Sequence, residues 1–339
     1  MFEKTPLIYS SRLSKISGCS VYLKLEADGE TIPQNLQPGH SFKSRGITRF
    51  IRNAIEKHGP QVHLIVASSG NAGYAAACAA RNLRLRCTVF IPEGVPQRAI
   101  DLLKDQEAEV TVRGKIYLET LDAAKEAAKG NNKAVLVPSY DDPLIWDGHA
   151  SMITEISSDL KKPDAIFLSV GGGGMLGGVM TGCKNVGWDD VPIIGLETIS
   201  CNCFHHSFLL NTGASSDFVT TLPPSVTKVR DENENLEMVH FHEFSSKASG
   251  SLGASRPSAR VLKMALERPG LIKCVSVQDE LSMSAGIRFA EDHKMMVELA
   301  CSTTLVPAYN RELLDRLGST QARPHSGVYH LRRFQNFVD

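Results

Sequence analysis

The feature that most constrains this chain is a regular alternation of short β-rich runs with longer segments of helical apolar spacing. Such runs are typical of buried strands, and apolar residues three or four positions apart are typical of helices. The expected strands are Val21–Glu26, His63–Ser68, Cys87–Pro92, Glu109–Gly114, Ala134–Pro138, Ala165–Val170 and Val191–Glu197. The expected helices are Gly70–Arg81, Pro96–Gln106, Tyr117–Ala128 and Gly148–Leu160. Because strand–helix alternation builds βαβ units, the sequence predicts an α/β fold of parallel twisted sheets flanked by helices.

Length and charge narrow the class of protein. A chain of 339 residues suits two domains of about 150 residues each. Lys plus Arg and Asp plus Glu both total 37, so no net field recruits nucleic acid or an anionic membrane. The amino terminus has no secretory-signal pattern, and no apolar run is long enough to span a membrane. The eight cysteines are scattered without zinc-ligand spacing, which predicts a reduced, cytoplasmic protein.

The first candidate site segment is His40–Gly46, which contains Lys43 just before a predicted helix. A single lysine among small polar residues is most often a solvated surface residue. Here the hydroxyls and amides at a helix start suit a bound anion. A lysine held beside such a site can form a Schiff base with a carbonyl compound.

The second segment is Ser68–Gly73 (SSGNAG), which joins a predicted strand to a helix of small residues. One interpretation is an ordinary βα turn, in which Asn and Gly take special backbone angles. The other is a nest of amides and hydroxyls that binds a carboxylate. Ligands of open α/β sheets bind at the carboxyl ends of the strands, and this loop lies at such an end.

The third segment is the glycine-rich run Gly171–Gly178, which follows the predicted strand Ala165–Val170. Glycines let the backbone approach a phosphate, and the following helix adds partial positive charge. No Lys-Ser/Thr pair follows, so the run is not a Walker A loop. Gly172, Gly174 and Gly177 do match G-x-G-x-x-G, with Glu197 about 20 residues further on, which leaves a nicotinamide-dependent dehydrogenase as an alternative.

In this order the three segments resemble the fold-type II pyridoxal-phosphate (PLP) enzymes, the tryptophan synthase β-like group, and within it the serine/threonine dehydratase family. SFKSRG is similar to the Schiff-base motif of that family, SSGNAG to its substrate-carboxylate loop and GGGG to its phosphate loop. Tyr140–Ser151 (YDDPLIWDGHAS), Val186–Thr198 and Val297–Cys301 (VELAC) resemble the animal-type L-serine dehydratases in particular.

The resemblance implies a role for each matched position. Lys43 would carry PLP as a Schiff base and act as the base on the substrate α-proton, while Phe42 would pack against the pyridine ring. Asn71 would hydrogen-bond the ring 3′-oxygen. The substrate carboxylate would be bound by Ser68, Ser69, Gly70 and Asn71. The other cofactor-binding positions would be Pro138, Gly171, Gly172, Gly173, Gly174, Met175 and Cys301. A neutral thiol beside the pyridine nitrogen, from Cys301, favours β-elimination.

Three residues, Glu197, Cys201 and Ser69, receive further catalytic or metal-binding roles. In the resembled family the glutamate at the end of the strand that corresponds to Val191–Glu197 helps to form a monovalent-cation site. The resemblance therefore implies that Glu197 and the backbone carbonyl of Cys201 bind K⁺ beside the cofactor. Cys203 stands where a racemase relative has an acidic ligand, and a thiol suits hard divalent cations poorly. A solvated glutamate is the plainer interpretation. Ser69 is shared with serine racemases, so we expect it to return a proton to some substrate and yield slow racemisation.

The sequence therefore predicts a PLP-dependent L-serine/L-threonine ammonia-lyase that acts on small amino acids as a homodimer. A small domain, residues 43–142, is expected inside a large PLP-binding domain formed by residues 1–42 and 143–339. A serine racemase, a nicotinamide-dependent dehydrogenase and an inactive ligand-binding paralogue are the alternatives.

Three segments depart from the family pattern. Residues 27–35 and 228–247 are insertions, and the second is expected to be polar, without an apolar face. The tail, residues 319–339, lacks the family's closing apolar strand, because His330 and Arg332-Arg333 break its apolar pattern. We expect this tail to be poorly ordered, which would expose a sheet edge and lower stability and cofactor occupancy.

Overall fold

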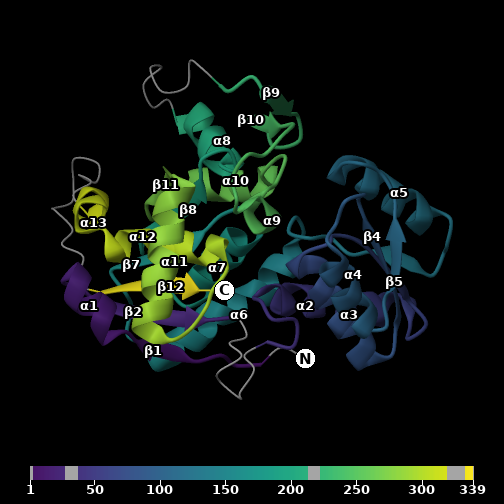
Figure 1. The fold of residues 1–339 in the computed structure, drawn as a ribbon, viewed down its shortest axis with the longest axis horizontal. Helices are drawn as coiled ribbons and strands as arrows, with labels where there is room; N and C mark the ends of the chain where they lie inside the picture. The colour runs from purple at the N-terminus through teal and green to yellow at the C-terminus, as the bar shows by residue number, and fades with distance from the viewer. Residues whose placement is uncertain (1–2, 27–36, 213–221, 319–332, 339) are drawn as a thin grey trace.

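The computed structural model describes residues 3–26, 37–212, 222–318 and 333–338. Its strands form a six-stranded sheet, a four-stranded sheet and a separate two-stranded ribbon. The two larger sheets lie side by side, the four-stranded one at the right of Figure 1. Each expected strand and helix is present with its ends shifted by a few residues, so the predicted α/β class is confirmed.

The six-stranded sheet combines strands from both ends of the chain. Its order is β1 (Leu7–Tyr9), β2 (Ser20–Leu25), β12 (Arg333–Val338), β7 (Ala165–Ser169), β8 (Ile193–Thr198) and β11 (Ile272–Val277). Only the edge strand β1 is antiparallel to its neighbour, and the other pairs are parallel. The carboxyl ends of β7 and β8 therefore open at one edge, the usual place for a ligand in such sheets.

The four-stranded sheet is built from one continuous stretch of chain. Its order is β5 (Glu109–Val112), β4 (Arg86–Ile91), β3 (His63–Ala67) and β6 (Ala134–Leu136), and all pairs are parallel. β3 is buried along its whole length, and its sequence is therefore a largely continuous apolar run without the alternation of a half-exposed strand. We propose that residues 43–142, which include this sheet, form the small domain.

Helices cover the faces of both sheets. Their bounds are α1 (Ser11–Ser17), α2 (Lys43–His58), α3 (Asn71–Leu83), α4 (Gln97–Asp105), α5 (Tyr117–Lys129), α6 (Pro143–Asp159), α7 (Gly174–Asn185), α8 (Cys203–Thr212), α9 (Ser249–Leu252), α10 (Ala259–Glu267), α11 (Asp279–His293), α12 (Leu299–Tyr309) and α13 (Arg311–Gly318). Strand β7 has buried side chains on both faces, so the sheet needs a layer of helices on each side. Ile166 packs in a cluster with Ile153 of α6, whereas Phe167 packs in another with Leu305 of α12.

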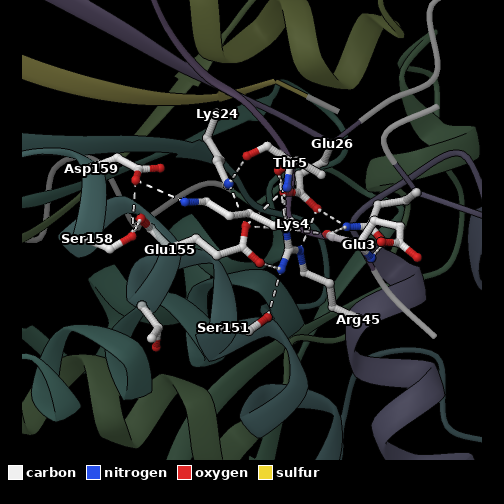
Figure 2. A network of polar contacts seen from close by, with 12 residues as sticks. Glu3, Lys4, Thr5, Lys24, Glu26, Arg45, Ser151, Glu155, Ser158 and Asp159 are labelled. Atoms are coloured by element: carbon white, nitrogen blue, oxygen red, sulfur yellow. Dashed lines mark hydrogen bonds and ion pairs between the residues drawn. The ribbon is translucent and has the colours of Figure 1, made fainter. Parts of the chain in front are cut away.

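A buried cluster of charges ties α2 to the six-stranded sheet (Figure 2). Arg45 of α2 binds the carboxylate of Glu26, after β2, through Nε at 2.7 Å and Nη2 at 2.9 Å. The same guanidinium binds Glu155 of α6 through Nη1 at 2.6 Å and Nη2 at 2.8 Å. Lys24 of β2 adds a second cation 2.6 Å from Glu155. Two cations thus face two carboxylates, which satisfies the requirement that buried charges be paired.

The insertion at residues 228–247 does have an apolar face, contrary to the expectation from its charge. Residues 226–241 form an antiparallel ribbon of β9 (Val226–Asp231) and β10 (Leu236–Phe241). Val239 and Phe241 are buried, with exposures of 0% and 1%, in a cluster that includes Cys203 of α8. The charged side chains of β9 lie mainly on the exposed face. The high charge of the segment therefore concealed the alternation of buried and exposed positions along its strands.

The expectation that the tail supplies no strand to the sheet is also wrong. β12 runs parallel between β2 and β7, with Phe334 aligned to Val21 and to Ala165. The tail therefore fills an interior position and leaves no missing-strand edge there. Residues 319–332 and 339, like the insertion at residues 27–35, lie outside the described part of the chain.

Candidate active site

Lys43 is the first residue of α2, and its amine reaches the end of the four-stranded sheet. Its Nζ donates a 2.6 Å hydrogen bond to the carbonyl oxygen of Ser139 and lies 5.3 Å from the ring centre of Phe42. The turn before the helix is closed locally, because the Ser44 hydroxyl accepts from the backbone N–H of Gly39 at 2.9 Å. Lys43 thus extends from the fixed start of α2 into the cavity that residues of both sheet-bearing parts line.

The ring of His149, on α6, packs against the start of α2. Its ring centre lies 4.8 Å from that of Phe42, and its ring fills space that a side chain at Gly46 would need. Burial, and then the nearby charges of Lys43 and Arg45, lower the pKa of His149 well below its ordinary value. Neutral imidazole is therefore the form packed under Phe42.

The loop Ser68–Gly70 joins β3 to α3 and lines the same cavity as Lys43. Glycine is required at Gly73, because a Cβ there would lie 2.0 Å from the carbonyl oxygen of Ser68. The Ser68 hydroxyl accepts from the N–H of Gly70 at 3.3 Å, which curls the loop. Asn71 begins α3, and its side-chain nitrogen donates to Glu298 at 3.1 Å. Among the described residues its second amide hydrogen has no acceptor, which is compatible with the predicted contact to the ring 3′-oxygen.

The glycine loop Gly171–Gly174 joins β7 to α7. Gly173 adopts a φ of 95°, a left-handed conformation that favours glycine. A Cβ on Gly172 would lie 2.5 Å from the ring of Tyr140, so this position also excludes a side chain. Within the described part of the chain, no acceptor faces the N–H groups of Gly171–Gly174. Backbone donors at a helix amino end, free of protein acceptors, form a cradle for a phosphate group.

These elements line one cavity of about 450 Å³, a size suited to a small-molecule cofactor. It brings together most of the residues predicted from the sequence. They are Phe42, Lys43, Ser68, Ser69, Gly70, Asn71, Gly171, Gly172, Gly173, Gly174 and Met175. Among the described residues that line it, Lys43 is the only lysine.

Four predicted residues do not line this cavity. Pro138 lies just before Ser139, which does, and Cys301 is buried beside the lining residue Ala300, with an exposure of 1%. Cys201 packs with Ala300 in a small apolar cluster. The fourth, Glu197, lies under α8. Their roles toward the cofactor or a cation stay predictions.

Glu197 is fully buried at the amino end of α8. Its carboxylate accepts hydrogen bonds from the N–H groups of Phe204 at 3.0 Å and His205 at 2.6 Å. Burial raises the pKa of Glu197 well above its ordinary value, and these two hydrogen bonds only partly offset that effect. Because Glu197 is fully buried and does not line the cavity, it cannot reach a ribose hydroxyl there, which argues against the dinucleotide interpretation of Gly172–Gly177. No group of three or more His, Cys, Asp or Glu side chains that could hold a metal occurs in the described ranges.

Sequence reasoning missed the opposite wall of the cavity. This wall comprises Tyr140, His240 of β10, the segment Ser249–Arg256 and Glu298. The Tyr140 hydroxyl donates to the carbonyl oxygen of Arg256 at 3.0 Å, which joins the end of the β6 region to that segment. Tyr140 and Glu298 stood in segments marked by the resemblance, Tyr140–Ser151 and Val297–Cys301, and His240 stood in the insertion 228–247, but none of these side chains was assigned to the site. The segment Ser249–Arg256 carries no local motif and reaches the cavity through long-range packing.

Comparison with known proteins agrees with this geometry. The family of pyridoxal-phosphate dependent enzymes matches residues 2–322. The chain belongs to this family. The human protein named L-serine dehydratase/L-threonine deaminase is 38% identical over 308 residues, which cover 91% of this chain and 82% of that protein. The human protein named serine dehydratase-like is 38% identical over 325 residues, which cover 95% and 86%.

A solved structure also resembles the fold. The crystal structure of a fungal L-serine ammonia-lyase from Rhizomucor miehei superposes with a TM-score of 0.79 at 26% identity, over 98% of this chain and 92% of that one. The predicted resemblance to serine/threonine dehydratases is confirmed, and the nicotinamide alternative is set aside. The free amides of the glycine loop and the Lys43 amine suit the phosphate and the aldehyde of PLP. No helix within the described ranges is both long and apolar enough to cross a lipid bilayer.

Proposed function

We propose that this protein is a PLP-dependent L-serine/L-threonine ammonia-lyase. The observation that carries the proposal is the placement of Lys43, the carboxylate loop and the free amides of Gly171–Gly174 around one cavity. Relatives at 36–38% identity that carry the name L-serine dehydratase/L-threonine deaminase support the choice of substrate.

In this proposal each wall of the cavity has its own task. When bound, PLP supplies an electron sink that makes the α-proton of an amino acid acidic. The amides of Gly171–Gly174 hold its phosphate, and Phe42 packs against the ring. The loop Ser68–Asn71 holds the substrate carboxylate, so that the α-carbon is oriented toward the Lys43 amine. Nζ of Lys43 takes the α-proton, and its hydrogen bond to Ser139 keeps the amine at that position.

The atoms of the reaction balance without an external oxidant or reductant. The α-proton and the β-hydroxyl leave together as water, and the released enamine product then takes up water and loses ammonia. Serine gives pyruvate, and threonine gives 2-oxobutyrate. We also propose the homodimer expected from the resemblance, which light scattering coupled to size exclusion tests.

A direct experiment separates this proposal from its alternatives. Purified protein should show a near-visible absorbance band that borohydride abolishes, and should convert L-serine or L-threonine to keto acid and ammonia in equal amounts. An absorbance band without turnover of either amino acid would favour an inactive ligand-binding paralogue. A protein without the band after incubation with PLP would contradict the assignment.

A further inference from the structure

The cavity is lined by residues from both sheet-bearing parts of the molecule. A Cβ placed on Gly70, after β3, would lie 3.4 Å from the carbonyl oxygen of Gly250 in α9. The α9 segment belongs to the six-stranded side, because Leu252 packs with Ala300 of α12. Two cavity-lining segments, one from each part, therefore lie in close contact.

Glu298 joins these segments. Its Oε1 accepts from Asn71 Nδ2 at 3.1 Å, and its Oε2 accepts from the Ser251 hydroxyl at 2.5 Å. Asn71 begins α3 on the four-stranded side, whereas Ser251 lies in α9 on the six-stranded side. One carboxylate thus holds a donor from each side, and all three residues line the cavity.

The position of Glu298 is itself fixed. It is the residue that caps the amino end of α12, and its backbone carbonyl accepts from the N–H groups of Cys301 and Ser302, both at 3.0 Å. Within the described part of the chain the carboxylate has no cationic partner, and both of its oxygens point to neutral donors. Hydrogen bonds to a charged acceptor are stronger than those between neutral groups, although exposure to solvent weakens them.

We propose that Glu298 is a positioning residue that acts as a latch: it holds the carboxylate loop and α9 together over PLP and a bound amino acid. The inference rests on the proposed function for the identity of the substrate, but the latch itself is a property of the protein. In the latched state the carboxylate loop, which ends at Asn71, is held against α9. Closure of this kind excludes water and keeps the reacting groups in register.

Three variants of the PLP-loaded enzyme test the latch. Glu298→Ala removes both hydrogen bonds, Ser251→Ala removes one, and Glu280→Ala removes an exposed carboxylate of α11 as the control. We expect Glu298→Ala to lower kcat/KM for L-serine on the order of ten-fold, the loss of one or two partly exposed charged hydrogen bonds. Ser251→Ala should have a smaller effect, and the double variant should be no worse than Glu298→Ala alone, because both changes open the same latch.

Hydrogen exchange supplies a readout that does not depend on turnover. The N–H groups of Leu252 and Gly253 donate within the α9 turn, so their exchange reports whether this segment opens. In Glu298→Ala these amides should exchange faster, while the free energy of unfolding stays at the parent value. Unchanged exchange at α9, or effects of the two single variants that multiply in the double variant, would overturn the latch. A parent protein without serine turnover would instead reject the proposed function, and the exchange result would still decide the latch.

Discussion

Nζ of Lys43 lies 2.6 Å from the backbone carbonyl oxygen of Ser139. The first residue comes from the start of α2 and the second from the loop between β6 and α6. A backbone carbonyl accepts but cannot donate, so it orients the amine without supplying a charge that would pair with it permanently. Through this contact Ser139, although distant in the sequence, fixes the position of the Lys43 amine.

Replacement of Lys43 by alanine should abolish keto-acid formation and the borohydride-sensitive absorbance band. The reason is that Lys43 is the one lysine among the described cavity-lining residues. The matched control is Lys57→Ala, which removes an exposed lysine from the last turn of the same helix. Absorbance spectroscopy and a keto-acid assay measure both effects. Retention of band and turnover by Lys43→Ala would show that another lysine holds the cofactor.

Ser69 provides a test for a racemase side activity. Its hydroxyl belongs to the carboxylate loop and lines the cavity, so it can return a proton to the substrate α-carbon. General acid–base assistance of this type is typically worth ~10²–10⁴-fold. We expect slow formation of D-serine beside dominant elimination, and loss of D-serine in Ser69→Ala with elimination retained. Chiral chromatography of the serine left after partial turnover decides the question, and absence of D-serine with the parent enzyme would reject it.

Potassium should stabilise the protein through Glu197. This buried carboxylate accepts two backbone hydrogen bonds and, among the described residues, has no cationic side chain as partner. A bound monovalent cation would neutralise its charge. We expect the melting temperature to rise by a few degrees in KCl relative to tetramethylammonium chloride at equal ionic strength, the scale of roughly 1–3 kcal/mol of binding. In Glu197→Gln this difference should disappear, and an undiminished difference in that variant would place the cation elsewhere.

Arg45 should contribute more to stability than a surface arginine on the same helix. Its guanidinium is buried between Glu26 and Glu155, so Arg45→Ala leaves the buried carboxylate of Glu26 and the partly buried carboxylate of Glu155 without their main partner. Breaking a buried pair in this way costs about 3–5 kcal/mol. Arg49→Ala is the control, because the Arg49–Asp147 pair is exposed and such pairs contribute about 0–1 kcal/mol. Equal losses of unfolding free energy in urea would contradict the distinction.

The same cluster predicts part of the acid sensitivity. Burial opposes ionisation of Glu155, but the hydrogen bonds and charges of Arg45 and Lys24 outweigh it and hold the pKa of this carboxyl below its ordinary value. A carboxyl with a lowered folded-state pKa contributes stability above its unfolded pKa of about 4.3, and that contribution is lost as pH falls through the folded value. Glu155→Gln should therefore lose unfolding free energy less steeply than the parent below about pH 4.3. Parallel curves would show that other carboxyls dominate.

The parts of the site that were predicted are those encoded locally. A lysine before a helix, an SSGNAG turn and four consecutive glycines each need their residue types for a nearby backbone reason, such as the close approach of Gly73 to Ser68. Ser251 carries no such signal, and the resemblance of Val297–Cys301 marked the segment around Glu298 without assigning this side chain to the site. Both residues reach the cavity because α9 and α12 pack on the six-stranded sheet, and that packing depends on contacts between distant segments.

The fold shows the same limit. Strands such as β3 were found because burial on both faces makes a continuous apolar run. The ribbon β9–β10 was missed because its exposed face is rich in charge and only alternate positions are buried. β12 was missed for a different reason: its place is set by pairing with β2, which lies near the other end of the chain.

A proline in β12 is the strictest test of that placement. Asn336 aligns with Leu23 of β2 and with Phe167 of β7, so its backbone lies between two hydrogen-bonded neighbours. Proline removes the N–H that the ladder needs and is confined to edge strands, strand starts and bulges, so inside a sheet it should be strongly destabilising. Asn336→Pro should therefore lower the midpoint of urea unfolding and the PLP content after purification. Asn336→Ala, which keeps the N–H, should change both far less. Because an edge or detached segment would accept proline without loss, equal stability of the two variants would place the strand outside the sheet.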